Sequence, residues 1–347
     1  MVRNKGLFCL VCWMLLTGCE DVFLKQPDSG MNISDFESVW HRVNDVYPFL
    51  DFKKINWDSV YSVYRPLAEE ARGDEFYLVL DDLLAELKDG HVYYHTDGGG
   101  AIYPFYPSRH FKDRHSYSPF VVRRYFNNEL QLTRSESAEY GITTENIGYL
   151  FLSDFHGGYL ADEFPEIISY LRNTKGLIID IRQKRGGDYQ TVLSIIRWFL
   201  RSPLSPPKLY ILGHLLEQPM IEPQSSFIYD KPIYVLINGS TFSAGEVTTE
   251  ILKQLPNVTA IGDTTGGGGV ASSNSPSEAR GEYLLPSGKL VYIGTGYIAR
   301  YDDQPFEWNG IPPDIRIEQT EKDILSGRDM ILEYALNNLR HGSASIK

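Results

Sequence analysis

The sequence has few cysteines, no apolar run long enough to span a membrane and no long cluster of basic residues. Only three of its 347 residues are cysteine, which excludes a disulfide scaffold. Acidic side chains outnumber basic ones by 45 to 33, and the net charge of −12 argues against nucleic acid as a partner. Because 42% of the residues are hydrophobic, intrinsic disorder is also excluded. A folded protein with one large or two modest domains remains.

The N-terminus has the pattern of an export signal. Arg3 and Lys5 precede an apolar stretch over residues 7–16, which has the length of a signal-peptide core and is too short to span a bilayer. The stretch ends in Leu16-Thr17-Gly18-Cys19, which resembles a bacterial lipoprotein box. In that motif the Cys thiol is acylated and becomes the new N-terminus.

We therefore expect residues 1–18 to be removed, Cys19 to carry a lipid and residues 19–31 to form a tether to the membrane. The other two cysteines lie in the leader, so no disulfide and no thiol chemistry would remain. The expected location is the cell envelope of a bacterium, with the outer membrane or cell surface favoured over the inner membrane. The alternative is an ordinary signal peptide with an incidental Cys, or a buried N-terminal helix.

Residues 32–95 have the pattern of a small helical subdomain. Apolar side chains at helical spacing predict helices over 34–47, 57–67 and 76–88. The third helix ends at Asp89-Gly90, where Gly suits the left-handed conformation that follows many helices.

The pattern then changes to short β runs, and we assign residues 96–146 to a β-rich insert. Strands are predicted over 92–95, 101–106, 121–126 and 129–133, with the last two forming a hairpin. The insert separates the helical part from the rest of the chain.

From residue 147 to 342 strands alternate with helices, which predicts an α/β core. Leu177-Ile178-Ile179 is a continuous apolar run, typical of a strand buried on both faces. The other predicted elements are helices over 191–200 and 244–255, strands over 233–237 and 258–261, a hairpin over 284–298, and a closing helix over 324–339.

The most informative segment for chemistry is residues 238–246, between a predicted buried strand and a helix. Backbone N–H groups at the start of a helix have no partner, and the helix dipole there favours negative charge. A hydroxyl at that junction, such as that of Ser243, is therefore placed like a nucleophile. The alternative is a plain N-cap, a position where Ser is common.

Two glycines follow another buried strand, at Gly186 and Gly187. Consecutive glycines allow close approach to a ligand and offer N–H donors with no blocking Cβ, so they could complete an oxyanion hole. The alternative is an ordinary strand-to-helix turn.

His91 lies where a helix meets a strand and is the candidate general base, because imidazole takes up a proton near neutral pH. The alternative is a structural histidine. His95 could share a metal with His91 only on a helix; on a strand the two lie ~13 Å apart, so we predict no metal and no cofactor.

Six segments, in this order, resemble the C-terminal processing (tail-specific) serine peptidases, a family that includes the tricorn protease core and the interphotoreceptor retinoid-binding repeats. They are Asp89-Gly90-His91, Gly148-Tyr149-Leu150, residues 177–182 with Gly186-Gly187, residues 241–246, residues 261–268, and residues 310–315. The resemblance implies an α/β fold with a crotonase-like ββα spiral core.

The resemblance also implies roles for single residues. Ser243 matches the nucleophile, and the N–H of Ala244 and the Gly186-Gly187 turn match the oxyanion donors. The tail-specific arm activates its Ser with a downstream Lys, which this chain lacks at the family position. The tricorn arm uses a His and a Glu, and the matching positions hold His91 and Glu307. The chain departs from the tricorn pattern at the residue before His91, which is Gly where that pattern has Ser.

The expected function is a serine peptidase that forms an acyl-enzyme on Ser243 with His91 as general base and acts on a peptide or protein substrate. Many relatives carry a PDZ domain before the core, and the insert over 96–146 offers about half the length that such a domain needs. The alternatives are a catalytically silent peptide- or lipid-binding protein on the same fold, and an esterase with the same site residues.

Overall fold

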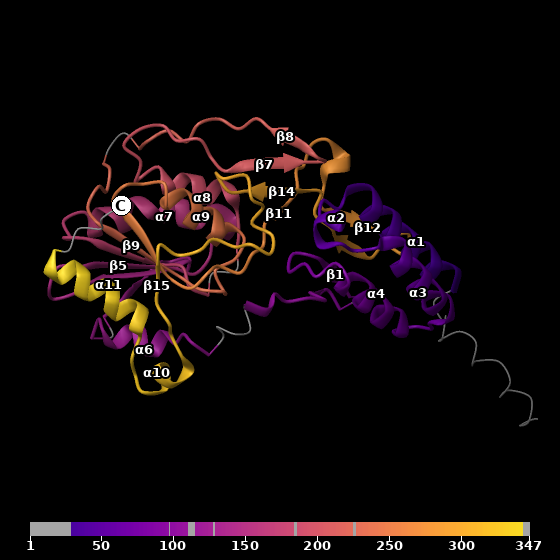
Figure 1. Ribbon diagram of the computed structural model, residues 1–347, viewed down its shortest axis with the longest axis horizontal. Helices are drawn as coiled ribbons and strands as arrows, with labels where there is room; N and C mark the ends of the chain where they lie inside the picture. Colours follow the sequence, from indigo (N-terminus) through magenta and orange to yellow (C-terminus); the bar gives the residue numbers. More distant parts are fainter. Residues whose placement is uncertain are drawn as a thin grey trace, which may run out of the picture.

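The computed structural model describes residues 29–96, 98–109, 115–127, 129–183, 186–224 and 227–342. The predicted leader, the lipidation site Cys19 and most of the predicted tether lie outside these residues. Two bodies are visible, a helical unit formed by the start of the chain and a larger α/β core (Figure 1). No helix in the described part of the chain is both long enough and apolar enough to cross a membrane.

The N-terminal unit contains the three helices that the sequence predicts and one short helix that it does not. The helices are α1 (Ser29–Val46), α2 (Leu50–Lys53), α3 (Trp57–Glu70) and α4 (Glu75–Ala85). The side chain of Asn56 caps α3 by accepting a hydrogen bond from the N–H of Ser59 (3.0 Å). Helices α1 and α3 are joined by Trp40 and Trp57, since each indole N–H donates to the backbone carbonyl of the other residue.

A four-stranded antiparallel sheet completes this unit with strands from distant parts of the chain. Its order is β12 (Glu282–Leu284), β13 (Leu290–Tyr292), β1 (Tyr93–His95) and β2 (Ala101–Ile102). Val291 and Ile293 share one buried apolar cluster with Leu84 and Leu87 of the helical part. The hairpin predicted over 284–298 thus forms over 282–292 and packs on the N-terminal helices, whereas residues 296–299 form a strand of another sheet.

The core is built on a seven-stranded mixed sheet, which confirms the α/β class. Its order is β15 (Ile315–Arg316), β10 (Val258–Gly262), β9 (Ile233–Ile237), β6 (Leu177–Asp180), β5 (Gly148–Leu152), β4 (Ala138–Ile142) and β3 (Gln131–Leu132). The strands from β15 to β5 are parallel, and β4 and β3 are antiparallel to their neighbours. The burial of β6, β9 and β10 on both faces explains their continuous apolar runs.

Helices cover both faces of this sheet. One face packs against α7 (Tyr159–Leu171), α8 (Tyr189–Ile196) and α9 (Ala244–Leu252). The other face packs against α6 (Pro119–Arg124) and α11 (Met330–His341). A third sheet, in the order β11 (Val270–Ala271), β14 (Gly296–Ala299), β7 (Lys208–Ile211) and β8 (His214–Leu216), lies beside the core (Figure 1).

The strand predicted over 121–126 is wrong, because this segment forms helix α6. Pro119 occupies the first turn, and Val121, Val122 and Phe126 are buried while Phe120 points to solvent. That burial has helical spacing, so packing against the sheet overrides the strand preference of β-branched residues. The predicted hairpin with 129–133 is therefore also absent, and β3 pairs with β4 instead.

Other predicted elements differ in extent. The closing helix predicted over 324–339 is two helices, α10 (Glu321–Leu325) and α11, because Gly327 adopts a left-handed φ of 81° between them. Asp329 then caps α11 by accepting from the N–H of Leu332 (3.0 Å). The strand predicted over 101–106 is limited to β2, and α7 and the β7–β8 hairpin are elements that the sequence analysis missed.

Candidate active site

Ser243 lies at the N-terminus of α9, in the turn that follows strand β9. Its φ of 55° is unusual for a residue other than glycine, and such a conformation costs about 1–3 kcal/mol. Neighbouring contacts hold the turn, since the hydroxyl of Thr241 donates to the carbonyl of Ile181 (3.0 Å) and the N–H of Gly266 donates to the carbonyl of Thr241 (2.8 Å). The structure thus places the hydroxyl where a helix begins.

Glu246 ties the backbone of Ser243 to the glycine-rich loop that follows β10. Its fully buried carboxylate accepts from the N–H groups of Ser243 (3.1 Å), Gly267 (2.9 Å) and Gly268 (2.7 Å), and from the hydroxyl of Thr265 (2.6 Å). Burial raises the pKa of Glu246 to about 7, although these four donors favour its charged form.

The sequence analysis assigned no role to Glu246, although its spacing of three residues after a helix-capping Ser is a recognisable signal. Because the N–H of Ser243 already donates a hydrogen bond to Glu246, this N–H is not free to bind an oxyanion. The next backbone donor along the chain is the N–H of Ala244, the first residue of helix α9.

Gly186 lies directly against Ser243, whereas Gly187 lies against Phe155, which follows strand β5. A Cβ built on Gly186 would lie 3.0 Å from Cβ of Ser243, 3.2 Å from its Oγ and 3.9 Å from the N atom of Ala244. A Cβ on Gly187 would lie 2.7–2.9 Å from atoms of Phe155. The structure therefore brings Gly186 together with Ser243 and Ala244, and it places Gly187 one residue away from them.

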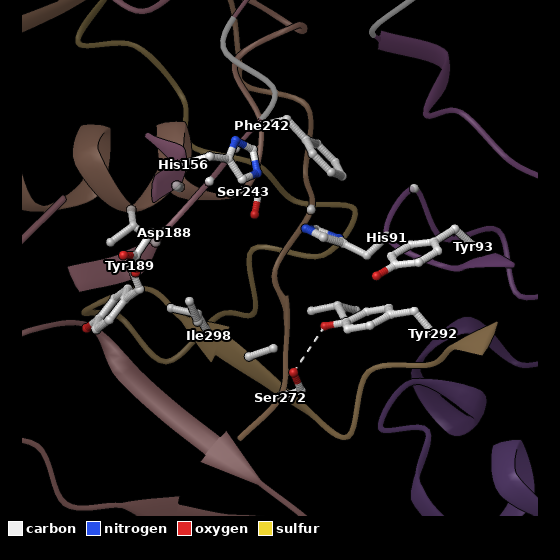
Figure 2. A pocket seen from close by; sticks show the side chains of 18 of the residues that line it. His91, Tyr93, His156, Asp188, Tyr189, Phe242, Ser243, Ser272, Tyr292 and Ile298 are labelled. Atoms are coloured by element: carbon white, nitrogen blue, oxygen red, sulfur yellow. Dashed lines mark hydrogen bonds between the residues drawn. The ribbon is translucent and has the colours of Figure 1, made fainter. Parts of the chain in front are cut away.

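His91 reaches the site from the N-terminal unit, just before β1. Its imidazole stacks on the ring of Phe242, with centroids 4.6 Å apart and an interplanar angle of 26°. The side chain is 16% exposed, and neither ring nitrogen has a hydrogen-bond partner among the described residues. Figure 2 shows His91 pointing toward Ser243 from the opposite side of one cavity.

Glu307, which the resemblance pairs with His91, lies against Lys53. The distance from Nζ of Lys53 to Oε1 of Glu307 is 2.6 Å, and Nζ lies 3.8 Å from Oδ2 of Asp89. Ligand atoms of Asp89, His91 and Glu307 lie within 4.8 Å of one another, which is a spacing that a metal could use. Because the ammonium of Lys53 already neutralises charge in this cluster, we assign no metal to it.

Burial and neighbouring charge shift the pKa values of the two carboxyl groups in opposite directions. Burial opposes ionisation of Asp89, but the charges of Lys53 and His91 outweigh this effect and lower the pKa of Asp89. Burial, together with the charge of Asp89, raises the pKa of Glu307 to about 8 despite the contact with Lys53. The surroundings therefore favour the charged form of Asp89 more than that of Glu307.

The cavity between the two bodies has a volume of about 810 Å³ and is walled mainly by aromatic and aliphatic side chains. Tyr93 and Tyr292 stack on one side with centroids 5.1 Å apart. The other apolar residues that line it are Tyr103, Tyr106, Pro107, Tyr189, Leu209, Phe242, Ala244, Val247, Val270, Ala271 and Ile298. A concave, mostly apolar cavity of this size is typical of a ligand-binding site.

A second histidine, His156, lines the same cavity and was missed by the sequence analysis. Its Nδ1 lies 2.5 Å from Oδ1 of Asp154, and its side chain is 73% exposed. In Figure 2 the His156 ring is drawn above Ser243, and His91 lies to the right of both. The motif Asp-x-His directly after a buried strand was the available signal.

Sequence comparison matches two parts of the chain to known families. The profile described as peptidase family S41 matches residues 146–317, and the profile of the tricorn protease C1 domain matches residues 34–85. The first match contains Gly186 and Ser243. The second covers most of the N-terminal helices.

Individual relatives agree with these matches. The carboxyl-terminal-processing protease of Synechocystis sp. is 25% identical over 209 residues, which are 58% of this chain and 45% of that protein. This chain thus spans less than half the length of that relative.

Solved structures show the same fold. A Parabacteroides merdae protein assigned as a peptidase superposes with a TM-score of 0.74 and 25% identity, covering 89% of this chain and 96% of that one. Mature CPAF, at 13% identity, shares the fold with a TM-score of 0.66 over 90% of this chain and 99% of its own. With both profiles and these relatives in agreement, the resemblance found in the sequence is confirmed, and the chain carries a peptidase family S41 domain over residues 146–317.

Proposed function

We propose that the chain hydrolyses bonds in peptide or protein substrates through an acyl-enzyme on Ser243, with His91 as general base. The observation that carries this proposal is the convergence of Gly186, Ser243 and Ala244 at the start of α9, with His91 pointing into the same cavity. Nucleophile, base and backbone donors are the parts that acyl transfer requires.

In the first step the imidazole of His91 takes the proton of the Ser243 hydroxyl while Oγ attacks the carbonyl carbon of the substrate. The carbonyl oxygen becomes an oxyanion, which the N–H of Ala244 and the N–H groups of the Gly186-Gly187 turn stabilise together with the dipole of α9. When the C–N bond breaks, the leaving amine takes the proton from the imidazolium. Water then repeats these steps and releases the acid.

His91 and Ser243 need to approach each other for this transfer, because neither imidazole nitrogen has a partner among the described residues. Catalytic hydrogen bonds are often long in a free enzyme and shorten when substrate binds. The stacking on Phe242, the residue before Ser243, keeps the imidazole next to the nucleophile until then.

We also infer that the mature protein is anchored to the cell envelope of a bacterium through a lipid on Cys19. Support comes from the Leu16-Thr17-Gly18-Cys19 motif behind an apolar stretch. The test is incorporation of an alkyne-tagged fatty acid in the producing cell. Wild type should carry the tag and Cys19→Ser should not; a wild-type chain without the tag contradicts the inference.

A fluorophosphonate probe tests the enzymatic proposal. Wild type should be labelled covalently, and Ser243→Ala and His91→Ala should lose the label. Ser62→Ala is the matched control, since its hydroxyl only donates to the carbonyl of Asp58 within helix α3. A folded wild-type protein that is never labelled supports the silent binding protein instead, and matched peptide and ester libraries separate a peptidase from an esterase.

A further inference from the structure

Three charged side chains form a buried cluster next to His91. Lys53 belongs to α2, Asp89 to the turn before β1 and Glu307 to the core segment after β14. Their side chains are 0%, 0% and 2% exposed. Charges are costly to bury unless they are matched, so the arrangement of this cluster needs an explanation.

The two oxygens of Asp89 face different partners. Oδ2 accepts from the hydroxyl of Tyr47 (2.7 Å) and lies 3.8 Å from Nζ of Lys53. Oδ1 accepts from the backbone N–H of His91 (2.8 Å) and lies 3.6 Å from Nδ1 of the imidazole. One oxygen of Asp89 is thus held by the cluster, and the other faces the ring of His91.

The two oxygens of Glu307 have other partners, although Glu307 lies in the same cluster as His91. Its Oε1 contacts Nζ of Lys53 at 2.6 Å, and its Oε2 accepts from the N–H of Gly269 (3.3 Å). Lys53 also donates to the backbone carbonyls of Leu87 (2.9 Å) and Lys88 (3.1 Å), just before Asp89. The contact between Lys53 and Glu307 therefore joins the N-terminal unit to the core at the segment that carries His91.

We propose that Asp89, and not Glu307, is the carboxylate that positions His91, an inference that rests on the proposed function. Lys53 and Glu307 instead hold the N-terminal unit against the core. Asp89 and His91 lie in one short turn, so their side chains stay close to each other. A rotation of the imidazole that shortens the 3.6 Å separation by under 1 Å would give a hydrogen bond from Nδ1–H to Oδ1. Nε2 is then the nitrogen left to take the proton of Ser243.

Electrostatics favour the same assignment. One ammonium can neutralise one of two buried carboxylates, and the groups facing the cluster are Lys53, Asp89, Glu307, Tyr47 and His91. The pKa of Asp89 is lowered and that of Glu307 is raised to about 8, with the causes given above. The cluster therefore favours the charged form of Asp89 over that of Glu307, and Asp89 is the carboxylate better suited to stabilise an imidazolium.

Two isosteric substitutions test the proposal. Asp89→Asn should lower kcat for a peptide substrate by roughly 10²–10⁴-fold, the loss expected when an imidazole adopts the wrong tautomer. Glu307→Gln keeps the shape and the acceptor for Lys53, so its loss should be under tenfold. The proposal is overturned if Glu307→Gln lowers kcat as much as Asp89→Asn does.

A second readout does not depend on activity. In the Ser243→Ala background, ¹⁵N NMR of the histidines should show His91 protonated on Nδ1, and Asp89→Asn should shift it toward the Nε2–H tautomer while Glu307→Gln does not. An unchanged tautomer in folded Asp89→Asn contradicts the proposal even if no peptidase activity is ever found. Should Asp89→Asn not fold, Glu307→Gln alone decides, since a loss of 100-fold or a tautomer change in that variant overturns it.

Discussion

Gly186 leaves the Ser243 hydroxyl uncovered, because a Cβ at position 186 would lie 3.2 Å from Oγ of Ser243 and 3.0 Å from its Cβ. The φ of Gly186, 135°, also lies in the region that disfavours other residues. One backbone position thus combines access for a substrate with a conformation available mainly to glycine.

Gly186→Ala should therefore lower kcat by roughly 10²–10³-fold, the loss expected when one oxyanion donor is misplaced. The rate of fluorophosphonate labelling and kcat/KM measure this effect. Gly73→Ala is the control, since Gly73 also has a positive φ of 54° but no atom within 4 Å of an added Cβ. Labelling of Gly186→Ala at the wild-type rate would remove this loop from the mechanism.

Phe242→Leu should lower kcat about tenfold with little change in KM. The ring of Phe242 stacks on His91 at 4.6 Å and contacts the Gly268 position, where an added Cβ would lie 2.0 Å from the ring. Leu keeps apolar volume but loses the flat surface that orients the imidazole. Steady-state kinetics with Phe242→Tyr as the conservative control test this, and equal losses in both variants would argue against a stacking role.

Local pattern was enough to find the elements that position Ser243. Strands β6, β9 and β10 are continuous apolar runs, and the start of α9 coincides with a Ser that has a Glu three residues later. These features depend on neighbours in sequence, so they can be recognised without a structure. The predicted end of the helix before His91 is wrong, because α4 ends at Ala85 and the left-handed residue is Lys88, with a φ of 48°, and not Gly90.

Roles that depend on tertiary contacts could not be derived in this way. Nothing in the short segment of α2 indicates that Lys53 is buried, because its partner Glu307 lies in another body of the protein. The family resemblance assigned Glu307 to support the imidazole of His91, whereas in the structure the carboxylate of Glu307 pairs with Lys53. The valines of α6 show the same limit, since packing and not propensity decides their conformation.

Arg182→Met should destabilise the core by about 3–5 kcal/mol, because it leaves two buried carboxylates without a counter-charge. The guanidinium of Arg182 is fully buried and lies 2.6 Å from Asp180 and 2.8 Å from Asp329. It joins the end of β6, which leads into the Gly186 turn, to the start of α11. Urea denaturation measures the loss.

Arg201→Met is the control, since its pair with Asp230 is exposed and should contribute under about 1 kcal/mol. A loss for Arg182→Met no larger than that of the control would mean that the buried cluster does not stabilise the fold.

Glu246 should make the protein less stable as pH rises. Its pKa increases from 4.5 in an exposed chain to about 7 in the fold, so the folded state binds the proton more tightly than the unfolded state. The stabilisation is complete below about pH 4.5 and is lost as pH rises through about 7, a change on the order of 3 kcal/mol. Glu307, with a pKa of about 8, contributes in the same direction at slightly higher pH.

Glu246→Gln removes this titration, at the cost of a constant loss because an amide cannot accept all four donors. Free energies of unfolding measured by urea at half-unit steps from pH 5 to pH 7 should fall steeply for wild type and much less for the variant. Parallel curves would show that Glu246 stays charged over this range. The bonds from Ser243, Gly267 and Gly268 would then outweigh its burial, and the loop beside the nucleophile would keep the same electrostatic anchor at every working pH.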